Sequence, residues 1–135
     1  MKPSIILIDD DHGPIDYYVD ALRLRGFDVR QIDSTDEAFV WLDDANAQPP
    51  TVIVLDMMLP PGNRLTLEET DGGLRSGVQI ARVARKKFPE VPLLALTNQN
   101  DPEIAGALPP ATKWKVKFET SPFAFADFVH SILGK

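Results

Sequence analysis

Two short runs of aliphatic, mostly β-branched residues each end in aspartate, and this arrangement constrains the fold more than any other feature of the chain. Residues 4–8 run into Asp9, Asp10 and Asp11, and residues 51–55 run into Asp56. Continuous runs of this kind are typical of strands that are buried on both faces of a parallel sheet. Because parallel strands end at the same edge of their sheet, the sequence predicts that these carboxylates meet there.

Apolar residues elsewhere recur at helical spacing and alternate with further strand patterns. They predict helices around residues 15–22, 38–45, 80–88 and 125–132, and a short helix over 101–108. Strands are predicted over 27–33, 93–96 and 113–118, the last with Trp114, Val116 and Phe118 on one buried face. This repeated β-α order predicts an α/β fold: a doubly wound, five-stranded parallel sheet with five flanking helices, formed by residues 1–135 as one domain.

Composition argues against several classes of function. The chain has no cysteine, so disulfide and thiolate chemistry are excluded, and its net charge of -6 argues against direct nucleic-acid binding. No apolar run is long enough for membrane insertion, and we expect a cytoplasmic protein. No glycine-rich phosphate loop follows the first strand, which argues against a nucleotide-binding enzyme.

Carboxylates crowded at one sheet edge repel one another unless a cation neutralises them. Oxygen-only ligation suits Mg²⁺, with Mn²⁺ as the alternative, so the acids predict a metal-assisted phosphate site. The simpler interpretation is that they are solvated strand-end acids. His12 and His130 lack partners at helical spacing and are expected at the surface.

Residues at four predicted strand ends resemble the motifs of receiver domains from two-component response regulators. The resemblance covers essentially the whole chain and rests on Ile8-Asp9-Asp10-Asp11, Leu55-Asp56-Met57-Met58-Leu59-Pro60, Leu96-Thr97-Asn98 and Lys117-Phe118. Each motif alone is weak, whereas four in order at matching strand ends are specific. The resemblance implies the flavodoxin-like, receiver type of the predicted α/β fold.

The chemistry of these side chains agrees with a phosphoryl-transfer site. Transfer depends mainly on positioning and charge neutralisation, and the carboxylate of Asp56 can accept a phosphoryl group as an acyl phosphate. Thr97 would donate its hydroxyl to one phosphoryl oxygen, and Lys117 would place a positive charge beside another. The expected metal ligands are Asp10, Asp9 (directly or through water), Asp56 and, by resemblance, the backbone carbonyl of Met58.

The resemblance implies a phosphoacceptor signalling domain. Its Mg²⁺-dependent phosphoryl transfer to Asp56 would come from a sensor histidine kinase or a phosphotransfer protein and would switch binding of a downstream protein. Such a domain assists its own phosphorylation and hydrolysis and is not otherwise an enzyme; it could be stand-alone or excised from a longer regulator. The alternative is a pseudo-receiver, an interaction module that is not phosphorylated. A phosphatase would need a second aspartate two positions after Asp56, where Met58 stands.

Some assignments stay open, and three features depart from the family pattern. Lys113 and Lys115 share the expected face of Lys117, and Trp114 is either a mobile switch aromatic or a core residue. Asp11 is expected to be solvated or helix-capping, and a register shifted by one along Asp9-Asp10-Asp11 is the alternative. Phe118 stands where the family usually has proline. The connection over residues 60–75 is unusually long, and we expect residues 63–72 to form a mobile flap beside the phosphate site; the alternative is a solvated insertion without a role. Pro109-Pro110 shortens the fourth helix.

Overall fold

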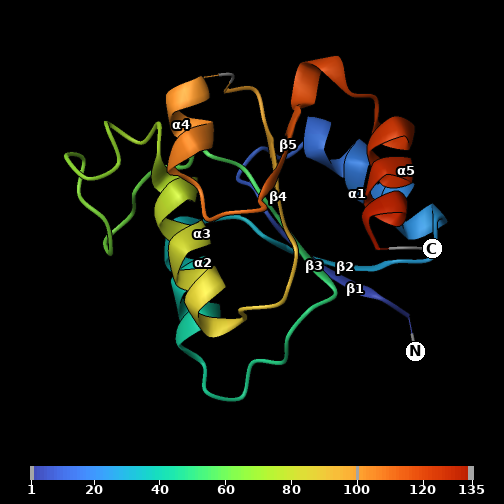
Figure 1. The fold of residues 1–135 in the computed structure, drawn as a ribbon, viewed down its shortest axis with the longest axis horizontal. Coiled ribbons are helices and arrows are strands. Elements are labelled where there is room, and N and C mark those ends of the chain that lie inside the picture. Colours follow the sequence, from blue (N-terminus) through green and yellow to red (C-terminus); the bar gives the residue numbers. More distant parts are fainter. Residues whose placement is uncertain (1, 100, 134–135) are drawn as a thin grey trace.

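A computed structural model describes residues 2–99 and 101–133, in which five strands form one sheet with helices on both faces (Figure 1). Every neighbouring pair of strands is parallel, and their order is β2-β1-β3-β4-β5. The α/β fold predicted from the sequence is therefore confirmed. The strands are β1 (Ser4–Ile8), β2 (Asp28–Ile32), β3 (Val52–Leu55), β4 (Leu93–Thr97) and β5 (Lys113–Val116); the helices are α1 (Pro14–Leu24), α2 (Thr35–Asp43), α3 (Ser76–Lys87), α4 (Pro102–Ala107) and α5 (Pro122–Ile132).

Alternate residues of the central strands enter two separate apolar layers, one on each face of the sheet. Helices α1 and α5 cover one face, where Tyr18, Leu22 and Phe125 pack, and α2, α3 and α4 cover the other (Figure 1). Strands β1, β3 and β4 lie inside the sheet with nearly every residue buried. This burial explains why they read as continuous apolar runs.

Local signals in the sequence account for the helix ends. The Ser34 hydroxyl accepts a hydrogen bond from the Glu37 N–H at 3.1 Å, and Ser121 caps α5 in the same way. Gly26 ends the α1 unit with a φ of 93°, a conformation that glycine adopts without strain. Helix α4 has only 6 residues, as Pro109 predicted. Within residues 2–99 and 101–133, no helix is both long and apolar enough to cross a bilayer.

The predicted strand over residues 113–118 is wrong at its end. Strand β5 stops at Val116, and residues 117–119 form one turn of 3₁₀ helix. This turn buries Lys117 and leaves the Phe118 side chain 70% exposed instead of in the core. A polar-apolar alternation does not reveal such a turn, because the contacts that hold it come from distant residues.

The long connection over residues 60–75 is organised by its own hydrogen bonds. Thr66 and Glu69 bond each other's N–H groups in the reciprocal pattern of a capping box, at 2.8 and 3.0 Å. Thr70 is fully buried, and its hydroxyl donates to the Thr66 carbonyl at 2.8 Å. The segment is tied to α2 where the N–H of Asn63 donates to Asp36 at 2.8 Å. The mobile flap suggested by its length stays a prediction, now for a segment with defined anchors.

Candidate functional site

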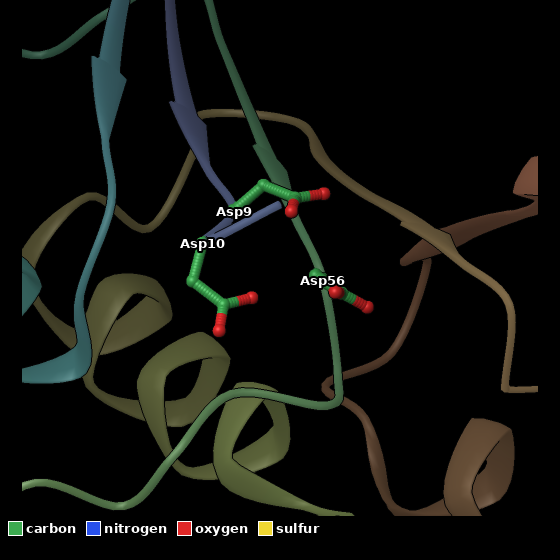
Figure 2. A group of neighbouring side chains, drawn as sticks. All are labelled: Asp9, Asp10 and Asp56. Atoms are coloured by element: carbon green, nitrogen blue, oxygen red, sulfur yellow. The ribbon is translucent and has the colours of Figure 1, made fainter. Parts of the chain in front are cut away.

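The register of the sheet brings the aspartates that follow β1 and β3 side by side. Ile8 pairs with Leu55, so Asp9 and Asp56 leave the sheet at the same level. The Asp56 N–H donates to the Ile8 carbonyl at 2.9 Å, which extends the ladder by one residue. Asp10 comes from the same strand end as Asp9, and all three carboxyl groups gather at this edge (Figure 2).

The three carboxylates form a cluster in which one oxygen from each lies within 4.8 Å of the others. Asp9 and Asp56 are buried, with exposed fractions of 1% and 7%, whereas Asp10 faces solvent. Buried carboxylates at this spacing destabilise one another because little water screens their charges. The cluster therefore favours a bound cation.

A single buried lysine faces this cluster in the described part of the chain. The Nζ of Lys117 lies 2.8 Å from Asp9 Oδ2, 3.8 Å from Asp56 Oδ2 and 3.9 Å from Asp11 Oδ2. Lys115 instead lies over the ring of Phe128, with its Nζ 4.4 Å from the centroid. The distances therefore show that Lys117, and not Lys115, faces the carboxylates. It also shows that Asp11, expected to be solvated, is near the same ammonium group.

Burial and mutual repulsion alter the titration of this cluster. Burial, followed by the charge of Asp56, raises the pKa of Asp9 to about 6, although the hydrogen bond from Lys117 opposes the rise. Burial and Asp56 also raise the pKa of Asp10. Burial alone would lower the pKa of Lys117, but its acidic neighbours, above all Asp9, outweigh burial and raise it. Lys117 is thus held in its charged form.

Thr97 and Met58 lie at the border of the cluster. Thr97 ends β4, is completely buried, and accepts a hydrogen bond from the Gln99 N–H on its hydroxyl at 3.1 Å. The N–H of Met58 donates to Asp56 Oδ1 at 3.3 Å, and Met58 lines a surface groove together with Asp10. No hydrogen bond joins Thr97 to the carboxylates among the described residues.

The donor set fits Mg²⁺ or Mn²⁺. Three carboxylates and a backbone carbonyl from Met58 would supply only oxygen ligands, which hard divalent cations prefer. One ammonium group from Lys117 balances only part of the charge of Asp9, Asp10 and Asp56. The remaining negative charge is the observation that indicates a cation.

Sequence reasoning missed three groups that hold the site in place. Gly77, in the first turn of α3, donates its N–H to the Met57 carbonyl at 3.0 Å, and a Cβ there would lie 2.7 Å from the Met57 Cα. The Tyr18 hydroxyl and the Asn98 side chain both bond the backbone around Lys117. The one available signal was Gly77 itself, just before the predicted helix over residues 80–88, because glycine is used where two parts of a backbone approach closely.

Other residues singled out in the sequence lie around the cluster. His12 is at the surface as predicted, and its Nε2 lies 3.1 Å from Asp33 Oδ2, a contact between the loop after β1 and the end of β2. Trp114 is half-buried and packs against the apolar layer on the α3 side. The peptide bond between Lys117 and Phe118 is trans.

No protein-family model matches the chain. The photosynthetic apparatus regulatory protein RegA of Cereibacter sphaeroides is 25% identical over 132 residues, which are 98% of this chain. The chain spans 62% of the length of that protein.

Solved structures agree more closely in fold than in sequence. A response regulator receiver protein from Sinorhizobium medicae superposes with a TM-score of 0.77 at 21% identity, over 98% of this chain and 95% of that one. The receiver domain of Thermotoga maritima DrrB, solved in a BeF₃-activated form, has a TM-score of 0.72 at 24% identity and covers both chains completely. The chain therefore has the fold of response regulator receiver domains, as its four motifs predicted.

Proposed function

We propose that this chain is a phosphoacceptor signalling domain in which Asp56 accepts a phosphoryl group. The observation that carries the proposal is the cluster itself: a buried Asp56 beside two further aspartates, with the ammonium of Lys117 at 3.8 Å. An aspartate that only caps a helix or faces solvent needs neither burial nor neighbouring carboxylates and a buried lysine. The receiver fold supports the same function by analogy.

The transfer itself requires one bond to form as another breaks. An oxygen of Asp56 attacks the phosphorus of a phosphohistidine, the N–P bond breaks with its electron pair staying on the imidazole, and an acyl phosphate results. Lys117 is charged and close enough to bind a phosphoryl oxygen, while Thr97 would donate its hydroxyl to another. A bound Mg²⁺ would neutralise charge that builds up on the phosphoryl oxygens.

The partners follow from this chemistry. The donor would be a sensor histidine kinase or a phosphotransfer protein, and the phosphorylated form would bind a downstream protein. We propose no direct contact with nucleic acid, consistent with the net charge of -6. The cytoplasmic location predicted from the sequence stays a prediction.

Intact-mass measurement after incubation with Mg²⁺ and acetyl phosphate tests the proposal. We expect one labile phosphoryl group on the wild-type protein and none on Asp56→Asn, which is nearly isosteric. The control is Asp33→Asn, which removes an exposed carboxylate outside the cluster and should leave the mass gain intact. EDTA should abolish it.

Each alternative gives a different result in the same experiment. A pseudo-receiver would gain no mass with any small phosphodonor, and a phosphatase would release phosphate over many turnovers without Asp56 staying modified. Phosphorylation of Asp56→Asn at the wild-type rate would refute the assignment of the phosphoacceptor.

A further inference from the structure

One peptide group beside the cluster is held from both of its sides. On the carbonyl side, the Tyr18 hydroxyl donates to the Lys117 oxygen at 2.7 Å. On the amide side, the Phe118 N–H donates to Asn98 Oδ1 at 2.9 Å. The Tyr18 hydroxyl also lies 2.7 Å from the carbonyl of Thr120, the residue that follows the 3₁₀ turn, so the two carbonyl oxygens share its single proton.

These two bonds come from different elements and fix the same peptide plane. Tyr18 belongs to α1, is buried, and meets the ring of Phe125 edge-on with 5.8 Å between centroids. Burial raises the pKa of Tyr18, so its hydroxyl keeps the proton that it donates. Asn98 is exposed and follows β4 directly. The peptide is thus fixed from the core side by Tyr18 and from the surface side by Asn98.

The orientation of this peptide sets the position from which the Lys117 side chain starts. Lysine has a flexible four-carbon stem, so a fixed ammonium position requires a fixed Cα and a packed path for the stem. The stem is buried, and Nζ lies between Asp9 and Asp56. The Lys117 carbonyl also accepts from the Thr120 N–H at 3.3 Å, so the Asn98 bond is the one that holds the amide side of the peptide. Its loss would let the peptide tilt about the held carbonyl and would spread the ammonium over more positions.

We propose that Asn98 is a positioning residue for Lys117, acting through the Phe118 N–H. The proposal rests on the proposed function insofar as Lys117 serves phosphoryl transfer. Asn98 directly follows Thr97, so the same side chain also joins the strand end that carries the hydroxyl to the turn that carries the ammonium. The Thr97 hydroxyl and the Lys117 ammonium, which would both bind phosphoryl oxygens, are thus connected through Asn98, which is not one of the expected metal ligands.

Hydrogen exchange of the Phe118 amide tests the link without any phosphorylation. Asn98→Ala should speed this exchange about fivefold, the equivalent of about 1 kcal/mol for one exposed hydrogen bond. Asn98→Asp keeps an oxygen acceptor and should restore most of the protection. The matched control, Asn46→Ala, removes another exposed asparagine, on the loop between α2 and β3, and should change nothing. Unchanged exchange in Asn98→Ala would refute the hydrogen bond and with it the proposal.

Phosphorylation rates with acetyl phosphate then test the effect on Lys117. Asn98→Ala should lower the rate about fivefold in the parent and in Phe118→Ala, which keeps the N–H. In Phe118→Pro, which has no N–H, Asn98→Ala should have no further effect. Equal losses in the proline and alanine backgrounds would show that Asn98 acts by another route and would overturn the proposal.

Failure of the proposed function and failure of this inference give different results. A wild-type protein that is never phosphorylated refutes the function. The ¹⁵Nζ signal of Lys117 still reports on the link in that case, because it should broaden or shift in Asn98→Ala and stay as in the wild type in Asn46→Ala. An unchanged Lys117 signal in both variants would refute the positioning role.

Discussion

Raising the pH of the metal-free protein from about 4 to about 7 should destabilise its folded state through Asp9. The pKa of this carboxyl is raised from 3.8 to about 6 by burial and by Asp56. A group whose pKa is higher in the folded state holds its proton more tightly there than in the unfolded chain. Its favourable contribution is therefore complete below about pH 4 and is lost as the pH rises through about 6.

The size of the effect follows from the shift. A rise of about 2 pKa units corresponds to roughly 3 kcal/mol at 1.36 kcal/mol per unit. The 2.8 Å ion pair with Lys117 does not cancel it, because loss of hydration and repulsion by Asp56 outweigh the attraction. Replacement of Asp9 by asparagine removes the titrating charge and should leave the protein more stable than wild type near neutral pH by up to that amount.

Urea unfolding in EDTA, followed by the fluorescence of the buried Trp41, measures the effect at several pH values. The quantity of interest is the difference in unfolding free energy between wild type and Asp9→Asn, because contributions that both proteins share cancel. This difference should grow between about pH 4 and 7, and Mg²⁺ should reduce it, since the metal binds the deprotonated carboxylate. A difference that stays constant over this range, or that shrinks as the pH rises, would refute the reasoning.

Three further predictions concern the surroundings of the cluster. Lys117→Ala should abolish most of the Mg²⁺-dependent fluorescence response to beryllium fluoride, whereas Lys115→Ala, whose ammonium lies over Phe128, should respond as wild type; the reverse result would mean that the wrong lysine was chosen. Gly77→Ala should destabilise the fold by about 1–3 kcal/mol or more in urea unfolding, because its Cβ would meet the backbone at Met57 and Asp56; Gly106→Ala, where a Cβ meets open space, should be neutral or slightly stabilising. Replacing residues 63–72 with a short Gly-Ser link should preserve the fold and change the dephosphorylation rate or the affinity for the kinase several-fold; unchanged values for both would make the segment a bystander.

The position of the aspartates could be predicted because it depends only on which residues form the central strands and on the shared direction of those strands. Parallel strands buried on both faces have a recognisable composition, and their shared direction brings Asp9 and Asp56 to one edge whatever the helices do. The choice of Lys117 over Lys113 and Lys115 needed more, namely the resemblance to receiver domains. The structure gives a reason for that choice, since Lys115 packs its ammonium on Phe128.

The end of β5 could not be predicted from its own residues. The turn at Lys117 depends on Tyr18, which lies 99 positions earlier, and on Asn98, which lies 20 positions from Phe118. No local pattern predicts either hydrogen bond, because Tyr18 belongs to the apolar stripe of a helix and Asn98 resembles an ordinary loop residue. The spacing of Thr66 and Glu69 matches a capping box, but no apolar helical pattern follows it, so the sequence did not predict the ordered turn there.

The close approach at Gly77 makes the two sides of the site differ in how they are held together. Backbone contact between α3 and the residues around Asp56 leaves no space between them, and the Ser76 hydroxyl adds a bond to the Leu59 carbonyl. On the opposite side, Thr97 and Lys117 sit at strand ends whose loops are joined through an exposed asparagine rather than through packed backbone. We therefore expect α3 to keep its position when a group binds at Asp56, and any shift to fall on the side of Thr97 and Lys117.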